Sequence, residues 1–314
     1  MKTPKSAGSS TFRLTLCAGT ILLLISSLNV RAQYNITTFN VPGETYTDAQ
    51  GIDGNNIVGY DSDSITSQSF LYDGSSATTI NVPGSIGTYV YGISGNNLVG
   101  YYQLGSSFYG FLYDGSSYTT LNVAGSILTQ AFGMSGNNIV GDYEDASDNV
   151  MGYLYDGSTY TTLSVPGATY TQAFGISGNN VVGVYQDSLG NQHGFLETGG
   201  TYTTIDVPGA TSTSVTGISG NDIVGSYSNG STRAGFLYDG SSYTTIDVPG
   251  SIVTGINGIS GDEIVGVYEM SPGDLQSFLA TPVPEPSVWA LAGLGAVVLW
   301  RRRNGLKNLS PRNS

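Results

Sequence analysis

Carboxylates are the side chains of this sequence that could do chemistry, and they gather at two places. One group is Asp142, Glu144, Asp145 and Asp148, and the other is Asp61 and Asp63. Two carboxyls can cleave a glycosidic bond as acid and base, and oxygen-rich loops can hold calcium. We expect both groups in loops between the second and third strands of a repeated unit. Neither has the twelve-residue order of an EF-hand, which favours solvated loop acids over a metal site.

The other reactive side chains do not complete a catalytic arrangement. His193 is the only histidine, so one chain cannot assemble a two-histidine metal site, and no Gly-X-Ser-X-Gly elbow accompanies it. We expect His193 in a loop. The only cysteine, Cys17, lies in an apolar N-terminal stretch, so thiol chemistry is not expected of the mature protein. The sequence predicts a non-enzymatic protein with no catalytic, metal-binding or cofactor-binding residues.

A repeated Tyr-Asp-Gly phrase accounts for several further acids. Its aspartates are Asp73, Asp114, Asp156 and Asp239. Aspartate accepts hydrogen bonds from backbone amides two or three residues ahead, and glycine permits the turn. We therefore interpret these four residues as turn formers.

The distribution of charge excludes nucleic acid as a partner. The formal net charge is −13, yet nine of the ten basic residues lie in the two ends of the chain. Between residues 33 and 282, 22 acidic residues accompany a single basic residue, Arg233, so this region carries −21. Binding to a phosphate backbone depends on Lys and Arg. An acidic surface rich in hydroxyls suits a protein that works in water outside the cell.

Residues 1–32 have the features of a secretory signal peptide. The basic residues Lys2, Lys5 and Arg13 precede an apolar stretch over 14–28. Further on, the small residue Ala32 precedes Gln33. We expect cleavage between Ala32 and Gln33, with the secretion translocon and signal peptidase as partners. A buried N-terminal helix is the alternative, although no later segment offers it a helical partner.

The body of the chain, residues 33–282, consists of six repeats of 41 or 42 residues. A Val-Pro-Gly phrase, with alanine for proline in one copy, begins at Val41, Val82, Val123, Val165, Val207 and Val248. Phrases close to Gly-Ile-Ser-Gly-Asn-Asn-Ile-Val-Gly and Phe-Leu-Tyr-Asp-Gly recur in step with it. Self-similarity at a fixed period predicts a repeat architecture.

Each repeat has the pattern of four short strands. In the fourth we expect them over 170–176, 181–185, 194–197 and 202–207, separated by turns and ended by Pro-Gly. Four strands in about forty residues match a propeller blade, and adjacent apolar residues indicate burial of both sheet faces. The sequence predicts an all-β, six-bladed β-propeller. An open repeat array or two separate β-domains is the alternative.

The two ends of the body predict how the propeller closes. The sixth repeat stops after Phe278-Leu279-Ala280 and lacks the fourth strand of the other repeats. A strand of that type stands instead before the first repeat, over 34–41. We expect this N-terminal strand to complete the last blade, since an open array would expose unpaired strand edges.

The repeats resemble the HAF family of extracellular repeats. In that family Gly-Phe-Leu-Tyr-Asp-Gly precedes Thr-Thr-Ile-Asp-Val-Pro-Gly and a Gly-Ile-Ser-Gly-Asn-Asn-Ile-Val-Gly phrase, as here. The resemblance covers nearly all of residues 34–282. It implies repetition and export and says little about activity, because those two features define the family.

After residue 282 the chain changes to a tail that resembles the PEP-CTERM sorting signal. Its motif is Val283, Pro284, Glu285 and Pro286; an uncharged stretch over 288–300 follows, and then Arg301, Arg302 and Arg303. The resemblance implies recognition of the Pro-Glu-Pro residues by an exosortase, a membrane transpeptidase of bacteria that make exopolysaccharide. Residues 283–303 are thus the expected sorting tail, and 304–314 a basic polar end.

The tail also predicts a passing contact with the inner membrane. Arginines beside an apolar stretch stay cytoplasmic. The uncharged stretch has 13 residues, fewer than the roughly 20 of a spanning helix. We expect transient anchoring followed by release to the cell surface or the medium; a permanent anchor is the alternative.

Two functions agree with these features. In the first, the body is a non-enzymatic component of an exopolysaccharide or biofilm matrix, and tyrosine and asparagine side chains on one rim bind extracellular polysaccharide or protein. In the second, it is a glycan-active hydrolase or lyase that uses loop carboxylates. Short loops, and acids that follow the repeat plan, favour the first.

Overall fold

The computed structural model describes residues 34–41, 47–62 and 67–283, and every regular element in these ranges is a β-strand. The 24 strands form antiparallel hairpins, and the part of the chain so described contains no helix. The predicted all-β class is confirmed. The predicted signal peptide and the tail from Pro284 onward lie outside the described residues.

Each repeat contributes its strands in chain order. The first repeat forms β2 (Thr47–Asp53), β3 (Asn56–Ser62), β4 (Ser67–Tyr72) and β5 (Ala77–Ile80). The second forms β6 (Gly87–Ser94), β7 (Asn97–Leu104), β8 (Ser107–Tyr113) and β9 (Tyr118–Leu121). The third forms β10 (Ser126–Ser135), β11 (Asn138–Asp145), β12 (Val150–Tyr155) and β13 (Tyr160–Leu163).

The other three repeats follow the same order. The fourth forms β14 (Tyr170–Ser177), β15 (Asn180–Gln186), β16 (Gln192–Thr198) and β17 (Thr201–Ile205). The fifth forms β18 (Ser212–Ser219), β19 (Asp222–Ser228), β20 (Arg233–Tyr238) and β21 (Tyr243–Ile246). The sixth forms only β22 (Val253–Ser260), β23 (Glu263–Glu269) and β24 (Leu275–Pro282).

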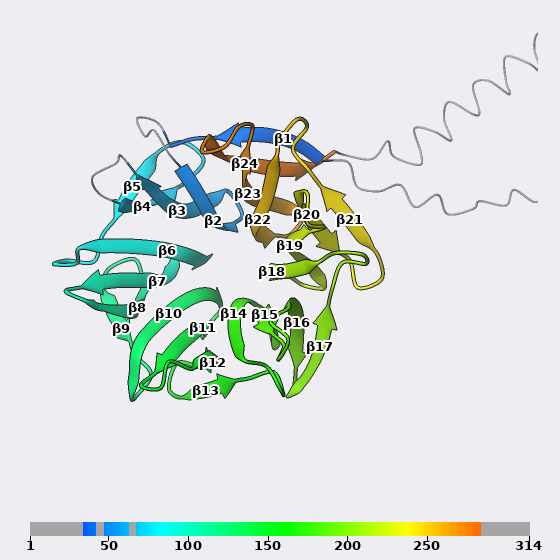
Figure 1. The fold of residues 1–314 in the computed structure, drawn as a ribbon. Coiled ribbons are helices and arrows are strands. Elements are labelled where there is room, and N and C mark those ends of the chain that lie inside the picture. Colours follow the sequence, from blue (N-terminus) through cyan, green and yellow to red (C-terminus); the bar gives the residue numbers. More distant parts are fainter. Residues whose placement is uncertain (1–33, 42–46, 63–66, 284–314) are drawn as a thin grey trace, which may run out of the picture. The chain divides into compact units, whose positions relative to one another are not determined.

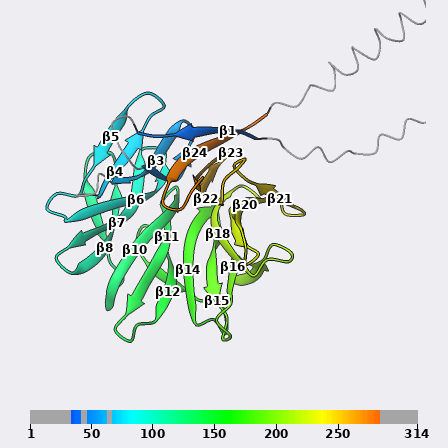
Figure 2. The same ribbon diagram turned by 45° about the horizontal axis from the view of Figure 1, so that its top comes forward.

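The N-terminal strand lies beside the last one. β1 (Tyr34–Phe39) pairs antiparallel with β24, from Tyr34 opposite Pro282 to Phe39 opposite Ser277. It occupies the place of the fourth strand that the sixth repeat lacks, as the sequence predicts. Figures 1 and 2 show the blue β1 and the orange β24 side by side in both views.

The hairpins are tight because glycine starts each inner turn. In the fourth repeat the two-residue loop Gly178-Asn179 joins β14 to β15, and Gly178 has φ 59°. A positive φ at the first loop residue is the requirement of a type II′ turn, which glycine meets without strain. The Gly-Asn phrases of the repeats are therefore hairpin turns, and the observed strands match the expected ones within two residues.

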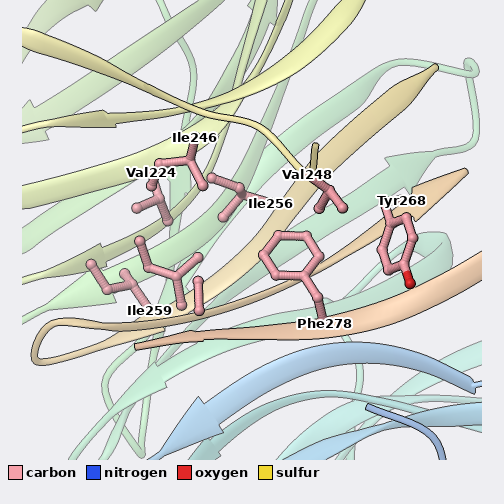
Figure 3. Close-up of a cluster of buried hydrophobic side chains, with 9 residues drawn as sticks. Val224, Ile246, Val248, Ile256, Ile259, Tyr268 and Phe278 are labelled. Carbon is pink, nitrogen blue, oxygen red and sulfur yellow. The ribbon is translucent and has the colours of Figure 1, made fainter. Parts of the chain in front are cut away.

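Neighbouring repeats share their hydrophobic cores. In Figure 3, Val224 and Ile246 of the fifth repeat pack with Ile256, Ile259 and Phe278 of the sixth. The corresponding aromatic residue of every third strand is fully buried; the six are Phe70, Phe111, Tyr153, Phe195, Phe236 and Phe278. Each four-stranded group thus buries apolar side chains against the next, in agreement with the adjacent apolar residues of the sequence.

The first strand of each repeat lies innermost. In Figure 1 the ends of β2, β6, β10, β14, β18 and β22 converge on a common centre. Each of these strands contacts the inner strand of the next repeat, and β22 contacts β2. At Gly92 a Cβ would lie 2.5 Å from the carbonyl oxygen of Phe132 in the next repeat. In the first three repeats the glycine at this position is therefore what lets each inner strand approach the next one.

The Ile-Val-Gly glycine has a different purpose from the glycine of the Gly-Ile-Ser phrase. A Cβ at Gly183 would instead lie 2.0 Å from the carbonyl oxygen of Gln172, on the partner strand of its own hairpin. That partner strand is bulged between Ala173 and Gly175. The glycine makes room for the bulge.

Candidate ligand-binding site

A β-bulge in each inner strand aims one extra side chain at the centre. Every inner strand shifts register by one residue against its hairpin partner, and bulges re-aim side chains. The bulged residues, which we name the constriction, are Gln50, Tyr91, Phe132, Phe174, Thr216 and Asn257. They line a cavity of about 70 Å³. That volume accommodates water but not a sugar ring, because small-molecule pockets measure roughly 300–1,000 Å³.

Beside the constriction, two positions of each repeat form what we name the axial mouth. The first position directly follows the threonine of the inner strand. The second lies opposite it on the next strand of the hairpin, directly after the Ile-Val-Gly glycine. In repeat order the pairs are Asp48 with Tyr60, Tyr89 with Tyr101, Gln130 with Asp142, Gln172 with Val184, Ser214 with Ser226, and Gly255 with Val267. No two pairs are alike, although the residues around them repeat.

Tyrosines fill the side of the axial mouth formed by the first two repeats. Tyr89 stacks on Tyr101 with ring centroids 4.9 Å apart, and Tyr60 meets Tyr89 edge-on at 5.7 Å. Tyr91 of the constriction stacks on Tyr101 at 5.6 Å. Burial, with a smaller contribution from the neighbouring Tyr60 and Tyr101, raises the pKa of Tyr91 well above its usual value. These tyrosine side chains offer flat faces and hydroxyls together.

Asp142 is one of the two acids of the axial mouth, and it is buried. Its side chain is 1% exposed. Gln172 of the next repeat donates a hydrogen bond to Oδ2, whereas Oδ1 has no partner among the described residues. Burial, helped by the charge of Glu144, raises the pKa of Asp142 to about 6, and the Gln172 hydrogen bond opposes this rise. Near pH 6 this carboxyl is therefore shared between its neutral and ionised forms.

Asp48 is the second carboxylate of the axial mouth. Its Oδ1 accepts hydrogen bonds from Nε2 of Gln50 at 2.7 Å and from Nδ2 of Asn257 at 3.2 Å. Asn257 also donates to the backbone oxygen of Ala49 at 2.8 Å. These bonds connect the sixth repeat to the first and hold the Asp48 carboxylate in place.

Small hydroxyl side chains line the opposite side. Ser214, Ser226 and Gly255 take the positions that tyrosines and acids fill elsewhere in the axial mouth. A pocket of about 390 Å³ opens there, lined by Ser212, Ser214, Ser226 and Ser228 together with Gln192, Tyr227 and Arg233. Its size is within the range of small-molecule pockets. We name it the serine pocket.

A larger hollow of about 510 Å³ lies beside β1. Phe39, Tyr72 and Leu279 contribute apolar surface to it, and Glu263 is its one acid among the described residues. Polar groups of the kind found in the axial mouth do not converge on it, so we place the candidate site at the axial mouth.

The expectation that the acid groups lie in loops is wrong for most of their members. Asp142, Glu144 and Asp145 belong to β11, and Asp61 belongs to β3 and is buried. Asp142 corresponds to Val184 of the fourth repeat, inside the second strand. Only Asp148 lies in the turn itself, with φ 62°. Asp63 lies outside the described residues.

Asp145 caps the β11–β12 hairpin. Its Oδ1 accepts hydrogen bonds from the backbone N–H groups of Ser147 at 2.8 Å and Asn149 at 3.1 Å. Hydrogen bonds from Asn149 and Ser147 lower the pKa of Asp145. No group of three or more histidine, cysteine or acidic residues in the described ranges could hold a metal ion.

His193 lies in β16 and not in a loop. Its Nδ1 is 2.7 Å from Oδ2 of Asp206, and its ring stacks on Tyr185 at 5.1 Å. Burial alone would lower the pKa of His193, but Asp206 and Asp187 outweigh it and raise the pKa. The position holds glutamine, tyrosine, methionine or alanine in other repeats, so the histidine is a local ion pair rather than part of a repeated site.

The Tyr-Asp-Gly aspartates form turns, as the sequence predicts. Oδ1 of Asp114 accepts hydrogen bonds from the backbone N–H groups of Ser116 at 2.9 Å and Ser117 at 2.8 Å. Asp73, Asp156 and Asp239 make the same pair of bonds. We name these four exposed turns the outer turns.

The predicted sorting and processing residues are nearly all outside the described part of the chain. Val283 is the last described residue; Pro284, Glu285, Pro286 and the three arginines follow it, and Ala32 and Gln33 precede β1. The described residues contain no helix long and apolar enough to cross a membrane.

Comparison with known families gives one match. Residues 282–303 match the PEP-CTERM protein-sorting motif. The matched range includes the predicted motif and the arginine cluster. It marks an exported protein with a C-terminal signal for sorting by an exosortase. Comparison with curated proteins gives no match.

Solved structures resemble the body in fold. The SapL1 lectin, solved with alpha methyl fucoside, has a TM-score of 0.50 at 13% identity over 77% of this chain and 97% of that chain. The β-propeller domain of the Trilobed protease from Pyrococcus furiosus has a TM-score of 0.45 at 8% identity over 77% and 98%. Trypanosoma rangeli sialidase has 0.45 at 12% over 83% and 58%. At 13% identity the likeness to the SapL1 lectin shows the fold alone, an all-β architecture of the propeller type.

Sequence reasoning missed the axial mouth, although the sequence contains its signal. Aligning the repeats on Ile-Val-Gly places Tyr60, Tyr101, Asp142, Val184 and Ser226 in one column. When one position of an otherwise uniform repeat holds a different residue type in nearly every copy, packing does not require any one side chain there. Comparing the repeats position by position, and not only by their shared phrases, would have identified it.

Proposed function

We propose that this exported protein is a non-enzymatic binding component of an extracellular polysaccharide matrix, and that the axial mouth is its binding site. The observation that carries the proposal is the departure of the axial mouth from the repeat plan. Repeated side chains of this body pack or form turns, whereas the mouth gathers tyrosine faces, amides, hydroxyls and two carboxylates. Tyrosine faces stack on sugar rings, and amides and hydroxyls bond sugar hydroxyls.

The scaffold of the proposal is a six-bladed ring closed by β1. A pattern of serine hydrogen bonds that occurs at two of the contacts between repeats supports this ring. Ser69 of the first repeat donates to the backbone oxygen of Thr88 at 2.7 Å and accepts from the N–H of Val90 at 2.8 Å. Ser277 of the sixth repeat donates to Thr47 O at 2.9 Å and accepts from Ala49 N–H at 2.8 Å. The contact from sixth to first repeat thus has the geometry of the contact from first to second.

Export and release complete the proposal. An exosortase would act at Pro284–Pro286 and free the body from the inner membrane, as the sorting motif at 282–303 supports. The resemblance of the repeats to the HAF family agrees with a place outside the cell. The lectin with a similar fold was solved with a fucoside, which supports sugar binding on this architecture.

The buried state of Asp142 favours binding over catalysis. A general acid must reach the glycosidic oxygen, but Asp142 is 1% exposed and holds a hydrogen bond from Gln172. Turnover would require the inner strands to open. Binding requires only the half-buried tyrosines and amides around it.

Binding of the mature body to a panel of polysaccharides, including that of its own host, tests the proposal. Tyr89→Ala should weaken binding at least about tenfold, because one stacking face and its desolvated contact are lost. Tyr113→Ala is the matched control, since Tyr113 stacks on Tyr118 at 4.5 Å in the outer strands. Equal losses in both variants, or no binding to any glycan, would reject the axial mouth as a binding site.

A glycan-active enzyme is the second candidate, and one observation favours it. Asp142 has a pKa of about 6, and Glu144 stands two residues along the same strand face. A raised pKa and a nearby carboxylate are features of an acid and base pair. Release of oligosaccharides by the wild type, lost in Asp142→Asn and in Glu144→Gln, would establish this candidate in place of the first.

A further inference from the structure

The serine pocket contains the only basic side chain of the body. Arg233 is exposed at the start of β20, where its backbone pairs with Ser228 and Val253. Its guanidinium makes no hydrogen bond or ion pair with any of the described residues. Acids are abundant in this body, 22 against one arginine between residues 33 and 282. An arginine that faces a pocket and engages none of them is available to a ligand.

The rest of the pocket is neutral and rich in hydroxyls. The side chains of Ser212 and Ser214 make no hydrogen bonds within the described residues, and Ser226 accepts one from the backbone N–H of Ile256 at 3.0 Å. A hydroxyl can donate and accept at once, which matches the hydroxyls of a sugar. No carboxylate lines the pocket. The pocket therefore combines one positive fork with several sugar-compatible partners.

Guanidinium chemistry narrows the ligand to an anion. The planar fork of arginine binds carboxylates and phosphates through two parallel hydrogen bonds. The charge of −21 on residues 33–282 favours carboxylates over phosphates, because the repulsion of a ligand grows with its negative charge. A dianionic phosphate or a dense polyanion is repelled more strongly than a group with a single negative charge. A monocarboxylate is the anion that this setting admits best.

We propose that the serine pocket binds the carboxylate of a uronic acid within the polysaccharide ligand. Arg233 holds the carboxylate, the serine hydroxyls bond the ring hydroxyls, and Tyr227 provides a wall of the pocket. The inference rests on the proposed sugar-binding function and names the class of sugar. It also explains why this side of the mouth carries serines, since larger side chains at Ser214 and Ser226 would fill the pocket.

Calorimetric titration of the mature body at pH 7 with methyl glucuronoside tests the inference, with methyl glucoside as the neutral probe. The wild type should bind the glucuronoside at least about tenfold more tightly than the glucoside. Arg233→Gln should remove that preference, so that the variant binds the two glycosides with equal affinity. Its melting temperature should equal that of the wild type, because the Arg233 side chain makes no bonds within the described residues.

Two control variants distinguish a direct bond between Arg233 and the carboxylate from the effect of the protein's net charge. The double variant Arg233→Gln with Asp114→Asn has the wild-type net charge and should still lack the preference. Arg233→Lys keeps the positive charge but loses the paired hydrogen-bond donors of the guanidinium, so it should retain part of the preference for the glucuronoside. Recovery of the preference in the double variant would overturn the inference, as would sodium acetate competing as well as the glucuronoside itself.

The same titrations distinguish failure of the inference from failure of the proposed function. Polysaccharide binding that Tyr89→Ala weakens and Arg233→Gln leaves unchanged would overturn the uronate assignment and retain the axial mouth as the binding site. Binding of no glycan at all would overturn both.

Discussion

Asp114 in the outer turns and Asp142 in the axial mouth carry the same side chain in opposite settings. Asp114 is exposed, and hydrogen bonds from Ser117 and Ser116 hold its pKa well below the usual range. Asp142 is buried, with one oxygen unpaired among the described residues and a pKa of about 6. Asp114 has counterparts in three other repeats and Asp142 has none. Repeated aspartates stabilise the fold, whereas the single one costs stability where a ligand would bind.

The comparison also predicts opposite responses to pH. A lowered pKa contributes stability that is present above the unfolded value of 3.8 and lost as the pH falls below it. A raised pKa works in the other sense: the folded state binds the proton more tightly, and stability is lost as the pH rises from 3.8 to about 6. The outer turns are therefore less stable at acidic pH. The axial mouth is less stable once the pH has risen above about 6.

The largest expected effect comes from removing a repeated element, the strand β1. Deletion of residues 33–41 from the mature body removes Ile36 from the last core and Phe39 and Val41 from the first. Val41 is buried, and Ile36 and Phe39 are partly buried. At roughly 1.5–3 kcal/mol for a fully buried side chain, losing these three together with the ladder to β24 approaches the whole stability of a marginal domain. We expect the deleted body to unfold at room temperature, as measured by thermal melting followed by circular dichroism.

A matched control keeps the strand and changes only its exposed face. Asn35→Ala with Thr37→Ala alters two exposed side chains of β1 and leaves the pairing with β24 intact. It should melt within a few degrees of the wild type. Equal melting temperatures of the deleted and complete bodies would show that β1 is dispensable and that no closed ring depends on it.

The second prediction concerns the unrepeated aspartate. Asp142→Asn replaces a buried ionisable group by a neutral one of the same shape that can still accept from Gln172. A shift from 3.8 to about 6 corresponds to roughly 3 kcal/mol. We expect the variant to melt roughly 5–10 °C above the wild type at pH 8, with a difference that shrinks as the pH falls from 6 to 4.

The same exchange in an outer turn is the control for Asp142→Asn. Asp114→Asn neutralises an exposed carboxylate and should give no such rise. A lower melting temperature of Asp142→Asn at pH 8 would mean that the ionised carboxylate stabilises the mouth, and it would end the contrast between the two aspartates.

Sequence reasoning succeeded where the repeat enforces a pattern and failed where it does not. The strands of the fourth repeat and the pairing of 34–41 with the last strand followed from phrases that recur, because packing imposes the same residues at each copy. Asp142 was assigned to a loop, and its local run, Gly-Asp-Tyr-Glu-Asp, does have low strand propensity. The ladder with β10 and β12 overrides that propensity and extends β11 through Asp145.

The same limit applies to the serine pocket. The sequence identified Arg233 as the only cation of the body, but the serines beside it come from β18 and β19 and Gln192 from β16 of the previous repeat. Their convergence depends on the register between two hairpins and on the approach of neighbouring repeats. Neither is encoded in a local phrase, so the pocket became visible only in the folded chain.

The smallest expected effect belongs to a single outer turn, and asparagine provides its control within the chain. Oδ1 of Asn229 accepts from the backbone N–H groups of Ser231 and Thr232, both at 3.0 Å, in the same manner as Asp114. Asp114→Ala removes both acceptors and should lower the melting temperature by a few degrees at pH 7, whereas Asp114→Asn should lower it less. Because the pKa of Asp114 is lowered in the folded state, its extra contribution over asparagine exists above pH 3.8 and disappears as the pH falls through the folded value. Melting curves of the three proteins at pH 7 and in strong acid measure this directly: the wild type and Asp114→Asn should converge in acid, with Asp114→Ala below both. A wild type that keeps its full advantage over Asp114→Asn in strong acid would contradict the assignment of Asp114 as an ionised turn former.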